Sequence, residues 1–154
     1  MVCQMDHIDK QILQVLQQHG KLPNNELAER VGLSPSPCLR RVKHLEDEGI
    51  IQKYVALIDP LRVNLGLTVF ARIWLRGQDE KTVNEFVEAV TGFSEVVECQ
   101  LIAGECDFFL RIVVEDLEAY RKFQIQHLSK ISGIQNVKTE IPLQQIKQTT
   151  ALPL

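Results

Sequence analysis

Four basic side chains lie close together in the first third of the chain with no acidic residue among them. They are Arg30, Arg40, Arg41 and Lys43, and acidic residues return directly afterwards at positions 46–48. Guanidinium and ammonium groups bind phosphates and guanine edges, so this cluster is a candidate nucleic-acid contact. The net charge of the whole chain is −3, so the positive charge is local. A solvated basic face on a core helix explains this charge pattern equally well.

A second candidate site is the short segment Ala103–Asp107, AGECD, which lies between two apolar runs. Gly104 allows the backbone to come close to a ligand, and free N–H groups in such a turn can hold a carboxylate. Asp107 can accept hydrogen bonds from an ammonium group, so the segment suits an α-amino acid, which carries both charges. The structural alternative is a plain hairpin turn with a capping Asp, because Gly and Asp are ordinary turn residues.

The basic cluster lies on a helix that is predicted to begin at two prolines. In the sequence SPSP, Ser34 is the expected N-cap, Pro35 the first helical residue and Pro37 the third. The first four N–H groups of a helix have no acceptor inside it, so the prolines remove no helical bond. The remaining N–H groups and hydroxyls point outward at the positive end of the helix dipole, where phosphates bind.

Helical spacing divides this third helix into two sides. If Val42 faces inward, the residues expected on the same side are Cys38, Leu39, Leu45 and Gly49. The opposite side has the composition of a recognition helix facing a major groove, with Ser36, Arg40, Lys43 and His44. With the cap and the remaining arginine added, the predicted DNA contacts are Ser34, Ser36, Arg40, Arg41, Lys43 and His44.

Two shorter helices are predicted before this one. The first has an apolar stripe at Ile8, Ile12, Leu13 and Leu16, and the second is expected to be capped by Asn24 and to end at Gly32. Ala28 allows the helices to approach closely and Gly32 permits a sharp turn, which is the helix-turn-helix design. One or two strands are expected at Ile50–Ile58, and the predicted DNA-binding domain spans residues 1–58.

The pattern changes after a turn-rich linker at residues 59–66, DPLRVNLG. The expected strands are Leu67–Leu75, Val96–Ala103, Phe108–Val114 and Val137–Leu143, and the expected helices are Glu80–Val90 and Leu117–Leu128. The order βαββαβ predicts a ferredoxin-like domain over residues 67–154, which makes the fold class α+β. Its uncovered sheet face is expected to be apolar, through residues such as Val69, Ala71 and Ile73, and to pack against a second copy in a symmetric dimer.

Two motifs resemble those of the leucine-responsive regulatory protein/AsnC family of transcription regulators. They are VGLSPSPCLRRVKHLEDEGIIQKYVALIDP in the first half and LIAGECDFFLR, Leu101–Arg111, in the second. The resemblance runs from about Met5 to Thr150. It implies a sequence-specific regulator that binds double-stranded DNA through its N-terminal domain and senses an amino acid through its C-terminal domain. It also implies dimers that assemble further, often into octamers.

The resemblance places the amino-acid effector between subunits and implies its contacts. Besides Gly104, Glu105, Cys106 and Asp107, they are Thr139, Glu140 and Ile141 on the last strand of a neighbouring subunit. By this resemblance Thr139 hydrogen-bonds the ligand and Ile141 touches its side chain. Glu140 departs from the family pattern, in which an uncharged residue is usual, so it favours a polar or cationic ligand. Leucine or methionine is nevertheless the preferred choice, and the ligand is expected to alter assembly or DNA affinity.

Other classes of protein fit the sequence less well. The apolar runs are too short to span a membrane and no signal peptide is visible, so a cytoplasmic location is expected. No cofactor is expected, and Cys99, Cys106 and His127 lack the spacing of a metal site. An enzyme is the main alternative, but no nucleophile–base pair, GxGxxG motif or P-loop is present. RNA binding is disfavoured because the sheet face that carries Phe108 and Phe109 is expected to be otherwise aliphatic, with no basic residues flanking it.

Overall fold

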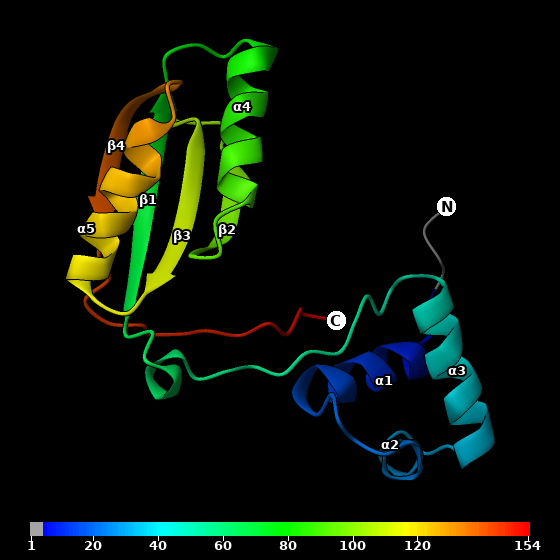
Figure 1. The fold of residues 1–154 in the computed structure, drawn as a ribbon. Coiled ribbons are helices and arrows are strands. Elements are labelled where there is room, and N and C mark those ends of the chain that lie inside the picture. Colours follow the sequence, from blue (N-terminus) through cyan, green and yellow to red (C-terminus); the bar gives the residue numbers. More distant parts are fainter. Residues whose placement is uncertain (1–4) are drawn as a thin grey trace. The chain divides into compact units, whose positions relative to one another are not determined.

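The computed structural model describes residues 5–154, and the chain forms two compact units (Figure 1). One unit reaches to Leu57 and also contains Lys147–Leu154, and the other is Ile58–Ile146. Residues 147–154 were predicted to belong to the second domain. The pattern of strands and helices does not indicate which unit the end of the chain packs against. No helix among the described residues has the length and apolar composition that crossing a membrane needs.

Three helices build the first unit: α1 (His7–Gln18), α2 (Asn24–Arg30) and α3 (Pro35–Asp47). A capping box fixes the start of α1, since Asp6 and Asp9 each accept the other's backbone N–H through their side chains. The core contains the expected stripe of α1 and the inner faces of α2 and α3. Its buried members are Ile12, Leu13, Leu27, Ala28, Val31, Cys38, Val42 and Leu45.

The turn between α2 and α3 depends on Gly32, whose φ of 69° is the left-handed conformation that glycine adopts without strain. The N–H of Leu33 donates to the carbonyl of Ala28, and that of Gly32 to Glu29, which is the Schellman arrangement. Ser34 is the N-cap of α3 and Pro35 its first residue, as predicted. Gly32 therefore turns the chain sharply enough for α3 to start three residues later, at Pro35.

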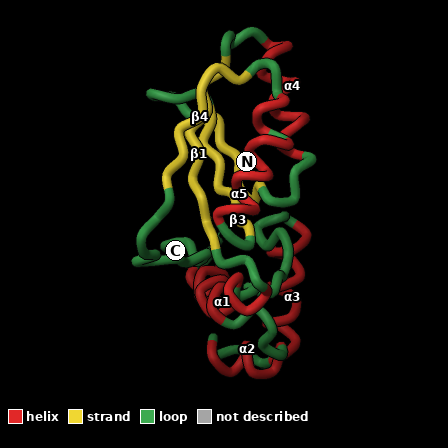
Figure 2. The backbone as a smooth tube through the Cα atoms, turned by 60° about the vertical axis from the view of Figure 1, so that its left-hand side comes forward, coloured by secondary structure: helices red, strands yellow, loops and turns green. Residues whose placement is uncertain are grey.

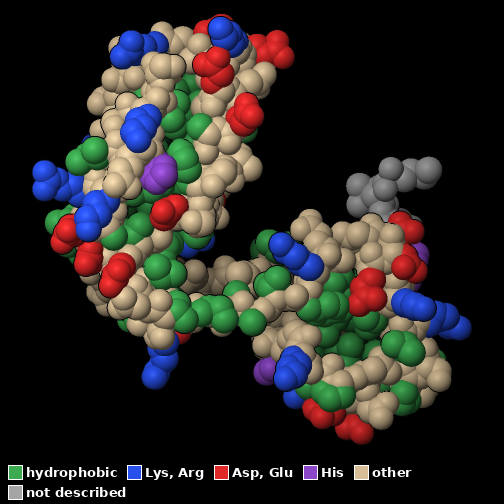
Figure 3. Space-filling model, viewed as in Figure 1, with side chains coloured by type: hydrophobic (Ala, Val, Ile, Leu, Met, Phe, Trp, Pro, Cys, Tyr) green, Lys and Arg blue, Asp and Glu red, His purple; other side chains and the backbone are tan. Residues whose placement is uncertain are grey.

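Three local expectations in this unit are wrong. Asn24 is not the cap of α2 but its first residue, and its side-chain amide donates to the carbonyl of Pro35, 2.9 Å away. Leu39 is exposed, because Cys38, Val42 and Leu45 already fill the inner face of α3. No strand forms at Ile50–Ile58, because no strand of the described chain pairs with this segment, and the N–H of Ile51 donates instead to the carbonyl of Leu45. Hydrophobic side chains along this segment, including Val55 and Leu57, are exposed instead (Figure 3).

The last residues of the chain lie against α1. The side-chain amide of Gln14 donates to the carbonyl of Leu154, 2.8 Å away. Gln17 donates to the carbonyl of Leu152 and accepts the N–H of the same residue. Two hydrogen bonds between one side chain and both backbone groups of one residue fix the register of the tail on the helix.

The second unit has the predicted βαββαβ order. Its strands are β1 (Leu67–Leu75), β2 (Val96–Leu101), β3 (Phe108–Val114) and β4 (Ile134–Glu140), and its helices are α4 (Glu80–Thr91) and α5 (Leu117–Gln126). A 3₁₀ turn, Pro60–Val63, precedes β1, and another, Leu128–Lys130, lies between α5 and β4 and contributes Leu128 to the core. The sheet is antiparallel with the order β2-β3-β1-β4, and the expected ferredoxin-like α+β fold is confirmed.

Both helices cover the same face of the sheet, which is seen nearly edge-on in Figure 2. The strand residues expected on the uncovered face, such as Val69, Ala71 and Ile73, are buried under Phe86 of α4 and Phe123 of α5. That assignment of faces is wrong, because strand alternation separates two sides without saying which side the helices take. The uncovered face is built from the half-buried residues between them, among them Phe70, Arg72, Trp74, Phe109 and Arg111, so the expectation of an aliphatic face without basic residues is also wrong.

Candidate functional site

The outward surface of α3 contains five of the six predicted DNA contacts. Ser34, Ser36, Arg40, Lys43 and His44 are all exposed. The three buried residues of the helix, Cys38, Val42 and Leu45, hold its opposite side in the core. This surface therefore offers hydroxyl, guanidinium, ammonium and imidazole groups on a helix that is fixed from behind.

The first turn of α3 has few backbone donors. Pro35 and Pro37 lack an N–H, and the N–H of Cys38 donates to the carbonyl of Ser34. Ser36 consequently carries the one N–H of this turn without an acceptor inside the helix. The hydroxyl of Ser34 makes no capping bond, because Pro37 occupies the N3 position from which a donor would normally come. One N–H and two serine hydroxyls are available here for an anion.

Arg41 lies apart from the other five residues. Its Nη1 is 2.7 Å from Oδ1 of Asp9 and 2.8 Å from Oδ2 of Asp6. The N–H of Asp9 and then the Arg41 guanidinium lower the pKa of the Asp6 carboxyl, and the two carboxylates raise the pKa of Arg41. The same two carboxylates cap α1, so Arg41 fastens α3 to the start of α1.

We expect Arg41→Ala to lower the melting temperature by several degrees and to weaken DNA binding through loss of α3 positioning. Removing a phosphate contact would reduce the salt dependence of binding by about one unit of log–log slope, whereas removing a positioning contact leaves that slope unchanged. Binding isotherms at several salt concentrations measure the difference. Asp6→Asn is the matched control, because it weakens the same contact by removing one of its two carboxylate charges and leaves the positive charge of Arg41 in place. A reduced slope in Arg41→Ala would make Arg41 a DNA contact.

Tyr54 connects the segment after α3 to the last turn of that helix. Its hydroxyl donates to Oε1 of Glu46 at 2.9 Å. Burial, followed by the hydrogen bond and the charge of Glu46, raises the pKa of Tyr54 to about 12. The raised pKa stabilises the folded unit below the ordinary tyrosine pKa of about 10, and this contribution is lost as the pH rises through the folded value.

We expect Glu46→Gln to move the pKa of Tyr54 back toward 10 without reaching it, since the charge is removed but the burial stays. The ultraviolet absorbance of tyrosinate reports the titration. The chain has two tyrosines, and Tyr54→Phe assigns the signal by leaving Tyr120 alone. An unchanged titration in Glu46→Gln would show that Glu46 does not hold the Tyr54 hydroxyl.

The second candidate site is the turn between β2 and β3. The N–H of Ile102 donates to the carbonyl of Asp107, and the indole N–H of Trp74 on β1 donates to the carbonyl of Glu105, 2.6 Å away. Gly104 and Glu105 are exposed and Cys106 is buried. The turn is thus tied to the neighbouring strand and presents a short exposed backbone segment.

Asp107 is the most constrained residue of this turn. Its Oδ2 accepts the N–H of Leu75 at 2.7 Å, and its Oδ1 accepts the side-chain amide of Gln78 at 2.8 Å. The carboxylate therefore caps the turn, as the structural alternative predicts. Each oxygen still keeps a second lone pair for a ligand. No spacing signal in the sequence points to Gln78. It reaches Asp107 because the register between β1 and β3 pairs Ile73 with Phe108.

A cavity of about 390 Å³ adjoins Asp107. Its polar lining comes from Asp107 and Gln78, and the rest is apolar: Leu75, Val83, Leu101, Ile102, Ala103 and Phe108. An anionic group beside an apolar wall suits a small ligand with one ammonium group and an aliphatic side chain.

The predicted residues of β4 do not line this cavity in the same chain. The hydroxyls of Thr139 and the buried Tyr120 of α5 are 2.7 Å apart and share a hydrogen bond. Glu140 forms ion pairs with Arg72 and Lys138, at 3.3 and 3.5 Å, and Ile141 is exposed. Within one chain, Arg72 therefore links Glu105, 3.9 Å away, to Glu140, but none of the three predicted residues at the end of β4 reaches the cavity at Asp107, and the negative charge of Glu140 already has partners.

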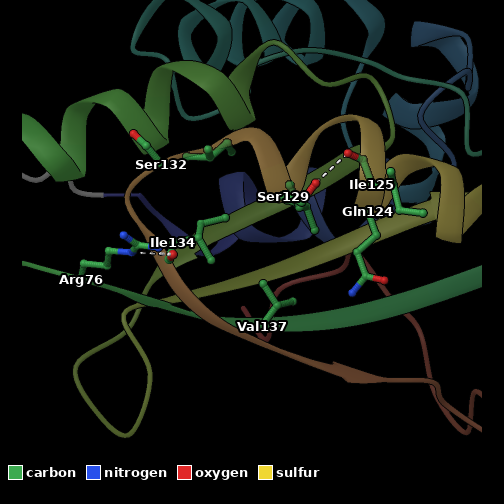
Figure 4. A pocket seen from close by; sticks show the side chains of 9 residues that line it. Arg76, Gln124, Ile125, Ser129, Ser132, Ile134 and Val137 are labelled. Carbon is green, nitrogen blue, oxygen red and sulfur yellow. Dashed lines mark hydrogen bonds between the residues drawn. The ribbon is translucent and has the colours of Figure 1, made fainter.

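Another cavity of about 330 Å³ lies between α5, the turn after it and β4 (Figure 4). Arg76 is its only charged lining residue, and its floor includes Leu128, Ile134 and Val137. The Nε of Arg76 donates to the carbonyl of Ile134 at 3.4 Å. Because no carboxylate lines this cavity, it has no counter-charge for an ammonium group and suits an amino acid less well than the cavity at Asp107.

The three residues considered for a metal are not gathered into a site. The ring of His127 packs against those of Phe93 and Phe123, with centroids 4.7 and 5.3 Å apart. Cys106 is buried and Cys99 is exposed, whereas Cys3 is outside the described residues. In the part of the chain that the structure describes, no group of three or more His, Cys, Asp or Glu could hold a metal ion.

Comparison with known proteins gives matches for both units. Residues 68–152 match the Lrp/AsnC ligand binding domain, and residues 5–52 match a winged helix-turn-helix DNA-binding domain. The leucine-responsive regulatory proteins of Klebsiella pneumoniae and Escherichia coli K12 are each 39% identical to this chain over 148 residues, covering 96% of this chain and 90% of the relative.

Solved structures are similar over almost the whole chain. A transcriptional regulator from Neisseria meningitidis, solved as a complex with L-Met, is 43% identical with a TM-score of 0.94. An AsnC family transcriptional regulator from Agrobacterium tumefaciens is 41% identical with a TM-score of 0.92. Each comparison covers 97% of both chains.

Proposed function

The chain belongs to the Lrp/AsnC family of DNA-binding transcription regulators, which are not enzymes, and we propose that α3 binds its operator. In this proposal an apolar amino acid bound at Asp107 controls DNA binding or assembly. The observation that supports DNA binding most directly is the exposed cationic surface of α3, whose opposite side is anchored in the core by three buried residues. Double-stranded DNA is the polyanion that such a helix fits, since the major groove admits a single α-helix.

Within α3, different residues have different proposed roles. Arg40 and Lys43 bind guanine edges or phosphates, and Ser36 binds either. Ser34 and the N–H of Ser36 bind a backbone phosphate at the start of the helix. His44 adds a contact at the edge of the surface. Arg41 is proposed as a positioning residue, because Asp6 and Asp9 already hold its guanidinium.

The proposed effector is methionine or leucine. The apolar wall of the cavity at Asp107 fits an aliphatic or thioether side chain, and Asp107 provides the partner for the ammonium group. The regulator from Neisseria meningitidis was solved with L-Met, and the relatives are named leucine-responsive, which supports the same class of ligand. The charge of Glu140 was the reason to expect a cationic ligand from the sequence. Because Glu140 is paired with Arg72 and Lys138, that reason is weaker in the structure.

A homodimer that assembles further, as far as an octamer, is the proposed oligomeric state. Phe70 and Phe109 stack on the uncovered sheet face with centroids 5.4 Å apart, beside the half-buried Trp74. A second copy of the sheet would bury these rings, and two copies would present two recognition helices to paired half-sites. In this proposal Gly104–Asp107 meets Thr139–Ile141 from another copy at the ligand.

Ligand control then follows from linkage between binding and assembly. An amino acid shifts the oligomer equilibrium only by as much as its affinities for the two assemblies differ. A site completed by two copies has such a difference, because the separated copies each offer half of the contacts.

Three measurements on the whole chain test the proposed function. Selection from a random DNA library should enrich one sequence, and a thermal-shift screen of the twenty amino acids should single out methionine or leucine. Sedimentation should give a multiple of 17.6 kDa that changes with the selected amino acid. Failure of enrichment would refute sequence-specific binding, absence of any shift would refute the effector, and a 17.6 kDa species alone at micromolar concentration would refute assembly.

A further inference from the structure

Leu39 is an apolar side chain on the outward surface of α3. It is 54% exposed, whereas its neighbour Cys38 is 0% and Val42 is 9% exposed. Leu39 also does not belong to the apolar cluster that forms the core of this unit. The fold thus gains little from a leucine at this position.

The neighbours of Leu39 on the helix surface are the proposed DNA contacts. Ser36 lies three residues before it and Lys43 four residues after it, which are the spacings of adjacent side chains on one helix face, and Arg40 is the next residue along the chain. Among the exposed large hydrophobic residues of the described chain, Leu39 is the one on α3. It is the fifth residue of that helix and so lies in the N-terminal half, which contacts base edges in helix-turn-helix proteins.

The polar neighbours and Leu39 suit different features of DNA. Arginine, lysine and serine recognise hydrogen-bonding groups, but the C5-methyl group of thymine forms no hydrogen bond and is read by apolar contact. Resting on the proposed role of α3, we infer that Leu39 is a specificity-determining residue that contacts a thymine methyl group in each half-site. An A·T pair is then required at one position that the neighbouring cations do not read.

Replacing thymine by deoxyuridine tests this inference, because the exchange removes the methyl group and keeps every hydrogen-bonding group. The site enriched by the full-length protein is synthesised with each thymine exchanged in turn, and affinity is measured by fluorescence anisotropy. We expect the exchange to weaken binding by about fourfold at one position of each half-site, the size of one buried methyl group. Leu39→Ala should bind the thymine site more weakly and show no further loss at that position.

Leu39→Met is the matched control, because it keeps an apolar side chain of similar reach and should keep the preference for thymine. Thermal unfolding should be the same for all three proteins, since Leu39 is outside the core. Equal affinity for thymine and deoxyuridine sites, or the same losses in Leu39→Ala as in the parent, would overturn the inference while leaving DNA binding intact. A change of sedimentation in Leu39→Ala with no effect of deoxyuridine would instead assign Leu39 to a contact between copies. If no DNA sequence is enriched, the proposed sequence-specific DNA binding is itself refuted, and with it the role of Leu39.

Discussion

Arg40→Ala is expected to lower affinity for the selected operator by about 1–3 kcal/mol if the guanidinium reads a base edge. That loss corresponds to roughly 5- to 150-fold in Kd. Arg40 is exposed on α3 and, unlike Arg41, has no carboxylate within ion-pairing distance among the described residues. The cost therefore comes from the interface with DNA and not from the fold. Anisotropy titrations with the operator and with scrambled DNA measure it.

The ratio of the two affinities distinguishes the possible roles of Arg40. A base contact is lost on the operator alone, whereas a phosphate contact weakens binding to both DNAs alike and reduces the salt slope. Arg62→Ala is the matched control, because Arg62 is an exposed arginine outside the first unit, with its side chain 87% accessible. Equal affinity of Arg40→Ala and the parent for the operator would exclude Arg40 from the interface.

Asp107→Asn is expected to abolish the thermal shift produced by the effector amino acid. The change removes the negative charge that faces the ammonium group, and hydrogen bonds to charged groups contribute about 1.5–3 kcal/mol. The asparagine can still accept the N–H of Leu75 through its one oxygen, so the turn between β2 and β3 is retained. Thermal unfolding with and without methionine or leucine measures both effects.

Gln78→Ala separates the structural role of Asp107 from ligand binding. It removes the hydrogen bond to Oδ1 and leaves the charge in place. We expect a slightly lower melting temperature without ligand and a preserved shift with ligand. If Asp107→Asn keeps the full shift, Asp107 does not bind the ammonium group and serves only to hold the turn.

Features that depend on neighbours along the chain were predictable from the sequence. The start of α3 at Ser34 and Pro35 follows from the missing proline donors, and the turn at Gly32 follows from the conformational freedom of glycine. The order of strands and helices after residue 66 follows from hydrophobic periodicity, and it led to the correct ferredoxin-like fold. The strands expected at Ile50–Ile58 failed because a strand needs a partner, and β propensity does not supply one.

The sequence by itself determined the helices of the first unit, the βαββαβ order of the second and the cationic character of the third helix, because helical period and turn chemistry act over a few residues. Only the tertiary structure decided which side chains are free to act. Cys38 and Leu39 are both apolar and one step apart, and packing against α1 and α2 selects Cys38 for the core. Arg41 is removed from the outward surface by carboxylates more than thirty positions away in the chain, and Asp107 gains its partners through strand pairing. Such contacts join residues that are distant in sequence, so no local pattern encodes them.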